Sequence, residues 1–442
     1  MWGSLPPVGE GRRSRGPVAA CLALALASLL LGPVGPAAAA NPVEDGKPPP
    51  EVACRYHDPK VRSQLLTGHA LSDHTWPEGR LAYLDAHQYT RGRGVVVAVV
   101  DSGVDAGHAQ LRGAVRPGAD VTGPAPVAGG GTDCSGHGTM VAGIIAARQV
   151  PGVGLVGIAP EAQVLPVREV WGVSPYGTVT SGSVAALLRG MRAALASGAK
   201  VINVSVSVAA VTLSAADRAE FARIARLAEA ADVLVVAASG NRSEYDGKNP
   251  ATYPAQLAAT SPAVMAVSGV TDAGLPDDDA ITGPFISVAA PDRAMPCLMS
   301  HGGLVPCEGT SFGAPFVSGL AALVRSRFPE LTAAQVRARI EATADHPSTE
   351  LPDARVGFGV VNPVAALTAV LPGARVPASP LPAPALPGEP SDAQLRRTTT
   401  AVAAGAVGAA ILVLVGWATV RRGRRRGWRP GRAVAGQVPT DR

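Results

Sequence analysis

The chain has 442 residues, enough for two or three domains, and a net charge of +5. Residues 421–442 hold eight arginines against one aspartate and residues 1–40 three arginines against one glutamate, so the part between them carries a net charge of −4. A charge placed in this way indicates targeting and membrane topology, and it gives no reason to expect nucleic-acid binding.

Residues 1–40 are predicted to be a secretory signal peptide. A basic stretch precedes an apolar segment at 21–31, and alanines at 38–40 provide a cleavage site. The alternative is an amphipathic first helix, but no polar face recurs in this segment. Residues 41–92 follow as an N-terminal extension, and consecutive prolines without a sustained period predict little regular structure there.

Residues 93–371 alternate apolar segments with amphipathic helical patterns and are predicted to form one α/β domain. Continuous apolar strands separated by helices are typical of a mostly parallel central sheet with helices on both faces, a three-layer fold. Ser214 with Asp217 and Thr332 with Gln335 form capping boxes that predict two helix starts. A further helix is expected at 184–195, ended by Gly198, and strands are expected at 95–101, 163–170, 200–208, 233–239 and 264–270.

Three polar residues of this domain have surroundings that suit catalysis. Asp101 ends an apolar strand, His137 lies between two glycines at a helix start, and Ser311 opens a later helix among small residues. Taken singly, they are explained by a solvated aspartate, a structural histidine and a helix-capping serine. Together they supply a nucleophile, the imidazole that takes its proton and the carboxylate that orients that imidazole.

The order Asp101, His137, Ser311 and the motifs VVDSGV, SGHGTMVAGIIAA and GTSFGAP resemble the subtilisin-like serine proteases. The resemblance spans residues 93–371 and implies a subtilisin-like fold with serine endopeptidase activity. It also implies that the side-chain amide of Asn241 and the backbone N–H of Ser311 form the oxyanion hole.

The resemblance further implies that Ser205, Val206 and Ser207 bind an extended substrate. Subtilisins commonly have a glycine pair at the end of this segment, whereas this chain has Ser207 and Val208 there. The bulkier edge predicts narrow specificity, or slow turnover on generic peptides.

Four acidic residues, Asp272, Asp277, Asp278 and Asp279, lie in one turn. A calcium site is one explanation, but the alternating oxygen-ligand spacing of a calcium loop is missing, so we expect a solvated acidic turn. We therefore predict neither a metal site nor a cofactor.

A proline-rich linker at 372–398, a transmembrane helix at 399–420 and a basic tail at 421–442 are predicted to follow the domain. The uncharged residues before the tail are long enough to cross a bilayer. The arginines directly after them place the C-terminus in the cytoplasm and the catalytic domain outside. A buried core helix is the alternative, which the basic flank disfavours.

Cys54, Cys134, Cys297 and Cys307 remain after removal of the signal peptide. An even number in an exported chain predicts two disulfides, with three possible pairings. We favour Cys54 with Cys134 and Cys297 with Cys307, because the second pair can close a local loop. The first pair would keep the extension attached as a permanent brace. A metal site is the alternative, but no CxxC or HxxxH spacing accompanies the cysteines.

The signal peptide, short extension, DCSGHGT motif, cysteines, proline-rich linker, single membrane helix and basic tail together resemble the mycosins. These are membrane-anchored subtilases of actinobacterial type VII secretion. The resemblance implies a single-pass cell-membrane endopeptidase that cleaves a limited set of exported proteins or peptides beside the secretion membrane complex. A second hypothesis is a scaffold that stabilises this complex, with proteolysis dispensable.

Overall fold

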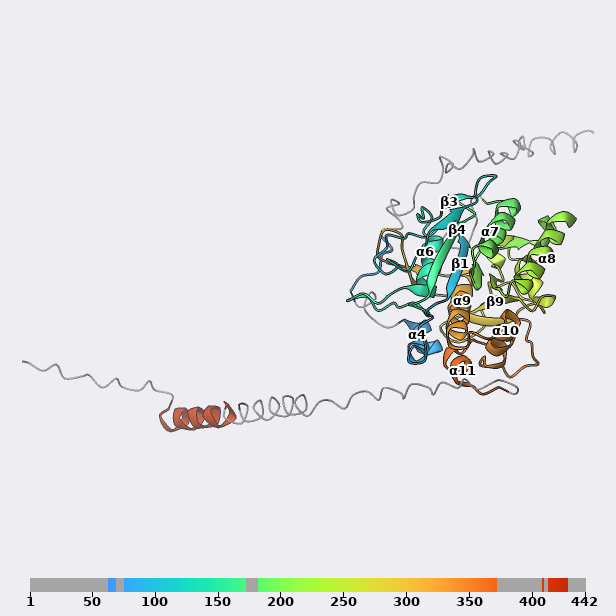
Figure 1. The fold of residues 1–442 in the computed structure, drawn as a ribbon. Helices are drawn as coiled ribbons and strands as arrows, with labels where there is room; N and C mark the ends of the chain where they lie inside the picture. Colours follow the sequence, from blue (N-terminus) through green and yellow to red (C-terminus); the bar gives the residue numbers. More distant parts are fainter. Residues whose placement is uncertain (1–62, 69–74, 172–181, 372–407, 409–411, 428–442) are drawn as a thin grey trace, which may run out of the picture.

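The computed structural model describes residues 63–68, 75–171, 182–371, 408 and 412–427 (Figure 1). The predicted signal peptide, the first part of the extension with Cys54, the linker and part of the predicted membrane helix lie outside these ranges. Residues 412–425 are helical. No helix in the described ranges is long and apolar enough to cross a membrane.

The centre of the fold is an eight-stranded sheet in the order β10-β9-β7-β5-β1-β4-β2-β3. All neighbours pair in parallel except β2 and β3, so the predicted mostly parallel sheet is confirmed. The inner strands are buried along almost their whole length, which explains their continuous apolar sequences. The strands are β1 (Val96–Asp101), β2 (Gly118–Asp120), β3 (Val127–Gly129), β4 (Gln163–Arg168), β5 (Val201–Val204), β7 (Leu234–Ala238), β9 (Val264–Val270) and β10 (Val288–Pro291).

The helices described between β3 and residue 371 are α6 (His137–Ala146), α7 (Val184–Ala196), α8 (Ala215–Ala230), α9 (Thr310–Arg327), α10 (Ala333–Ala342) and α11 (Pro363–Thr368). Successive residues of β1 point to opposite faces of the sheet. Gly190 of α7 approaches Val100 closely, and Gly138 of α6 approaches Asp101, so α6 and α7 cover opposite faces. Helix α9 packs beside α6, and α8 packs beside α7 (Figure 1). The predicted three-layer arrangement is therefore confirmed.

The predicted helix ends are also confirmed. Ser214 and Asp217 bond reciprocally at the start of α8, as do Thr332 and Gln335 at the start of α10. Gly198 follows the end of α7 with a φ of 79°. Glycine adopts this left-handed conformation without the steric cost that a side chain brings.

The strand predicted at 200–208 is shorter than expected. Strand β5 ends at Val204, and the chain leaves the main sheet for β6 (Val208–Ala209), which pairs antiparallel with β8 (Thr252–Tyr253). Hydrogen bonds of side chains hold the turn of the chain between β5 and β6. The Asn203 amide donates to Ser205 Oγ over 2.9 Å, and that hydroxyl donates to the Ser311 carbonyl over 2.7 Å. These bonds direct residues 205–207 towards the start of α9.

The prediction of little regular structure at 41–92 is wrong for the last part of this segment. Two helices form there, α4 (Trp76–Leu81) and α5 (Tyr83–Ala86), and the side chains of Leu81 and Tyr83 are buried. The Tyr83 hydroxyl donates to the Val156 carbonyl over 2.9 Å. Both helices are too short for a helical period to show in the sequence, and packing against the domain stabilises them.

A β-hairpin of β11 (Met295–Leu298) and β12 (Leu304–Cys307) is closed by a disulfide between Cys297 and Cys307, as predicted. Cys134 is disulfide-bonded as well. Its predicted partner, Cys54, lies outside the described residues, so that pairing stays a prediction. Short 3-10 helices complete the domain: η2 (Ala210–Thr212), η3 (Arg242–Tyr245) and η4 (Ala255–Ala259).

Candidate active site

Asp101 and His137 form a buried hydrogen-bonded pair at the carboxyl end of β1. Nδ1 of His137 lies 2.8 Å from Oδ1 and 3.0 Å from Oδ2 of Asp101, and both side chains have an exposed fraction of 0%. Because a carboxylate accepts, Nδ1 carries the proton and Nε2 is the basic nitrogen of the neutral ring. Within the described part of the chain, Nε2 has no hydrogen-bond partner. The imidazole therefore has one nitrogen oriented by Asp101 and one available to take a proton.

The two glycines beside His137 are required by the packing around it. A Cβ atom at Gly138 would lie 2.0 Å from the carbonyl oxygen of Gly103, and Gly136 has a φ of 86°. A larger side chain at either position would force the backbone to move. The motif SGHG thus lets the start of α6 approach the end of β1 closely enough for the two side chains to bond.

Asp133, which sequence reasoning missed, fixes the start of α6. Its buried carboxylate accepts from the Gly136 N–H and the Ser102 hydroxyl at 2.9 Å each, and from the Thr139 N–H and hydroxyl at 2.8 and 2.6 Å. Burial raises the pKa of Asp133, and the bonds from Thr139 and Gly136 oppose that effect. An acidic residue shortly before a helix start is the signal that could have found it, because carboxylates cap helix N-termini.

Ser311 is the second residue of α9 and lies at the same edge of the sheet. Its hydroxyl donates to the backbone carbonyl of Ser205 over 2.9 Å. The ring of the next residue, Phe312, packs against the ring of His137 with centroids 5.1 Å apart. The structure therefore brings the helix start that carries Ser311 beside His137, with the hydroxyl turned towards Ser205 and not bonded to Nε2.

Asn241 lies after β7 and is tied to the start of α9. Its Oδ1 accepts from the backbone N–H and the hydroxyl of Thr310 over 3.0 and 3.1 Å. These bonds fix the orientation of the amide and leave Nδ2 as the outward donor. Nδ2 donates to Oε1 of Glu244 over 2.5 Å. Burial raises the pKa of Glu244 to about 7, although the bond from Asn241 and the nearby His137 act in the opposite direction.

The predicted substrate segment, Ser205 to Ser207, lies between these groups and a surface cavity of about 680 Å³. Val206 is buried. Ser207 shares a hydrogen bond of 3.3 Å with the Tyr245 hydroxyl. A Cβ atom at Gly240 would lie 2.8 Å from Ser207 Oγ, so the serine fills space that a glycine would leave open. This filled edge supports the prediction of restricted substrate access, which stays a prediction.

Glu169 is a second buried carboxyl group that the sequence did not reveal. It follows β4, and its backbone N–H donates to the Asp101 carbonyl over 2.9 Å. Its Oε1 has no hydrogen-bond partner among the residues that the structure describes. Burial, and then the negative charge of Asp101, raise the pKa of Glu169 to about 8, with Arg189 opposing them. The group is therefore protonated at neutral pH.

The acidic turn at 271–280 is solvated at Asp272 and Asp278, as expected, but the expectation of a solvated turn is wrong for Asp277. Asp277 is buried and pairs with Arg293 over 2.9 Å. Asp278 is exposed and pairs with Arg355 over 2.5 Å. Arginines that are distant in sequence thus pair with the carboxylates of the turn. The local sequence pattern could not predict these pairs. Within the described ranges, no group of three or more His, Cys, Asp or Glu side chains could hold a metal ion.

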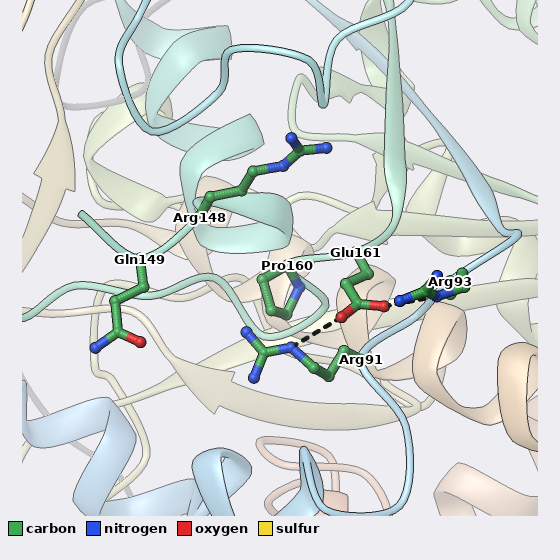
Figure 2. Close-up of a pocket in the computed structure, with 6 residues that line it drawn as sticks. All are labelled: Arg91, Arg93, Arg148, Gln149, Pro160 and Glu161. Carbon is green, nitrogen blue, oxygen red and sulfur yellow. Dashed lines mark hydrogen bonds and ion pairs between the residues drawn. The ribbon is translucent and has the colours of Figure 1, made fainter.

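A cavity of about 470 Å³ lies at the other end of the sheet, where Arg93 and Glu161 precede β1 and β4 (Figure 2). Glu161 pairs with Arg91 over 3.3 Å and with Arg93 over 2.9 Å (Figure 2). The Arg148 guanidinium instead donates to the carbonyls of Arg112 and Gly113. Catalytic groups in open parallel sheets gather at the carboxyl ends of strands. This cavity is therefore separate from the site around His137.

Residues 92–359 match the model of the subtilase family, Peptidase S8. The chain therefore belongs to the subtilase family, and it is a serine endopeptidase. Its fold, with a parallel sheet covered by helices on both faces and a site at the carboxyl edge, is the subtilisin-like fold.

Within this family the chain is similar to the mycosins over nearly its whole length. It is 35% identical to Mycosin-1 of Mycobacterium tuberculosis (strain ATCC 25618 / H37Rv), over 92% of this chain and 98% of that protein. It is 36% identical to Mycosin-4 of the same strain, over 94% and 97% of the two chains.

Solved structures agree with these relatives. The crystal structure of MycP1 with the N-terminal propeptide removed has a TM-score of 0.58 and 35% sequence identity, over 68% of this chain and 99% of that chain. A chain in the structure of an intact ESX-5 inner membrane complex has a TM-score of 0.59 and 30% identity, over 80% and 93%. The similarity thus includes a protein that is part of a membrane assembly.

Proposed function

We propose that Asp101, His137 and Ser311 are the catalytic triad of this endopeptidase, and that Asn241 is an oxyanion donor. The observation that carries the proposal is the buried bond between Asp101 and His137. It leaves Nε2 with no hydrogen-bond partner among the described residues, beside the helix start of Ser311. A fully desolvated carboxylate–imidazole pair is well suited to general-base catalysis, because it fixes the tautomer of the imidazole and stabilises its charged form.

The proposed reaction begins when the Ser311 side chain rotates from the Ser205 carbonyl to Nε2 of His137. Nε2 takes the hydroxyl proton as Oγ attacks the substrate carbonyl, and Asp101 stabilises the imidazolium that forms. Asn241 Nδ2 and the Ser311 N–H stabilise the negative carbonyl oxygen. The imidazolium then protonates the leaving amine, and a water molecule repeats these steps to release the acyl group.

We further propose that the catalytic domain is extracytoplasmic, anchored by the helix predicted at 399–420 with the tail at 421–442 in the cytoplasm. The similarity to a chain of the ESX-5 inner membrane complex, and to one in the periplasmic assembly of that complex, supports this placement. It also supports a type VII secretion membrane complex as partner. The substrates are then a limited set of exported proteins, in keeping with the filled edge at Ser207.

Labelling by a serine-directed phosphonate tests the triad. The full-length chain should be labelled at Ser311, and Ser311→Ala should remove both labelling and peptide cleavage. Ser326→Ala is the matched control, because this serine lies on the same helix and its hydroxyl donates to the Arg93 carbonyl at the other end of the sheet. Labelling that persists in Ser311→Ala, at any other residue, would refute the assignment.

A comparison of the exported proteins of wild-type and Ser311→Ala cells tests the physiological role. A protein that is shorter in the wild type than in the variant identifies the substrate. Identical exported proteins together with intact labelling of Ser311 would show that the enzyme does not process the secreted set.

A further inference from the structure

Glu244 contacts the donor that the proposed reaction uses to hold the substrate oxygen. Its Oε1 accepts a hydrogen bond from Asn241 Nδ2 over 2.5 Å. In the resting enzyme a carboxyl group therefore occupies one of the two N–H groups of this amide and lies beside the position where the negative oxygen would form.

The contact is not a consequence of a misplaced amide. Asn241 Oδ1 accepts from the Thr310 N–H and hydroxyl, so the amide is held from the other side and cannot flip its nitrogen away from Glu244. Glu244 belongs to η3, which starts directly after Asn241, and its own backbone N–H donates to the Asn241 carbonyl over 3.1 Å. The two side chains are therefore brought together by local backbone geometry.

The carboxyl group has room to leave. Glu244 also lines the cavity of about 680 Å³ beside Ser207, Tyr245 and Lys248. Among the described residues the Glu244 carboxylate is held by the bond from Asn241 and by no salt bridge, although Lys248 lines the same cavity. A rotation of this side chain into the cavity would free Nδ2 without moving the backbone.

We propose that Glu244 is a positioning residue, which holds the Nδ2 donor of Asn241 in the resting enzyme, and that its ionised carboxyl group must withdraw before a negative substrate oxygen can form beside that donor. This inference rests on the proposed function, because it requires Asn241 to be an oxyanion donor. It would account for the predicted slow turnover on generic peptides, because each substrate would have to displace a charge-assisted hydrogen bond, which is stronger than a neutral one.

The proposal predicts a specific dependence on pH. An ionised Glu244 holds Nδ2 more strongly and repels the negative charge that develops on the substrate oxygen, and the protonated form does neither. The titratable groups that interact with this carboxyl are His137, Asp279 and Tyr245. Asp246 and Lys248 line the same cavity. Since the pKa of Glu244 is raised to about 7, its restraint should be weak at pH 6 and strong at pH 8.

The rate of Ser311 labelling by a small fluorophosphonate measures this restraint in the full-length chain. At pH 8, Glu244→Gln and Glu244→Ala should label at least tenfold faster than the wild type, and the ratio of variant to wild-type rates should shrink towards one at pH 6. Because Glu244 and His137 interact, the rate is measured over the whole pH range for each form, which separates the ionisation of the imidazole from that of the carboxyl group. Glu229→Gln, an exposed position in α8, is the matched control and should keep a ratio of one throughout.

Two results would overturn the inference. One is labelling of both Glu244 variants at or below the wild-type rate at pH 8, which would mean that the carboxyl group supports the site. The other is a faster rate with a ratio that does not change with pH, which would mean a structural effect unrelated to ionisation. If no form is labelled at Ser311, the proposed function itself fails. The Ala variant answers the question should the Gln variant not fold.

Discussion

Replacement of Glu169 by glutamine should stabilise the protein in a manner that depends on pH. The carboxyl group is buried beside Asp101, and its pKa is raised from 4.5 to about 8. Between these two values the folded state holds a proton that the unfolded state has released. The free energy of unfolding of the wild type therefore falls as pH rises through this window and levels off above pH 8. Below pH 4.5 the carboxyl group is protonated in both states, so Glu169 causes no pH dependence of stability there.

The magnitude follows from the size of the pKa shift. Each pH unit in the window costs about 1.4 kcal/mol, so the rise from pH 5 to pH 8 costs about 4 kcal/mol. Glutamine has nearly the same shape and no proton to lose. At roughly 2–4 °C per kcal/mol for a domain of this size class, the Tm of Glu169→Gln relative to the wild type should increase by roughly 8–16 °C over this range.

Differential scanning fluorimetry of the full-length wild type and Glu169→Gln, at intervals between pH 5 and pH 8, measures this difference. The same substitution at the exposed Glu229 isolates the effect of burial. A Tm difference between Glu169→Gln and the wild type that stays constant across the range would show that Glu169 is ionised in the folded protein. The description of this carboxyl as a neutral buried group would then be wrong.

Two further predictions concern the site and its frame. Asn241→Ala should lower kcat about 100- to 1000-fold with little change in KM, and a loss of kcat of this size is known for the corresponding donor in subtilisin. Steady-state kinetics measure both constants. An unchanged kcat would show that Asn241 is not an oxyanion donor. Joint replacement of Cys297 and Cys307 by serine should lower the free energy of unfolding by about 2–3 kcal/mol, because the disulfide closes a loop with a sequence separation of 10. Denaturant unfolding checks this, and an unchanged midpoint would contradict it.

The parts of the fold that the sequence predicts are those where one physical pattern dominates. The inner strands are buried on both faces, so their apolar sequences are continuous. Capping boxes such as Ser214 with Asp217 satisfy the first N–H groups of a helix with side chains nearby in sequence. The glycines of SGHG also show in the sequence, because the close approach of Gly138 to Gly103 forbids any side chain there.

Other features depend on residues that are distant in the chain. The acidic turn at 271–280 looks solvated until Arg293 and Arg355 are placed against it. The contact of Glu244 with Asn241 is local, yet the amide can donate to it only because Thr310 holds the other side. The motifs therefore predict which residues take part in the proposed reaction. The resting arrangement of Ser311 and Glu244 can be seen only in the structure.

The structure of the covalent phosphonate adduct of the full-length chain is the most direct test of the proposed site. In the adduct, Ser311 Oγ should be bonded to phosphorus, and His137 Nε2 should lie about 2.7–3.1 Å from an oxygen of the adduct. Asn241 Nδ2 should donate to a phosphonyl oxygen, with the Glu244 side chain turned away from that nitrogen. An adduct on another residue, or an imidazole that bonds to Asp101 and reaches no atom of the Ser311 adduct, would contradict the account.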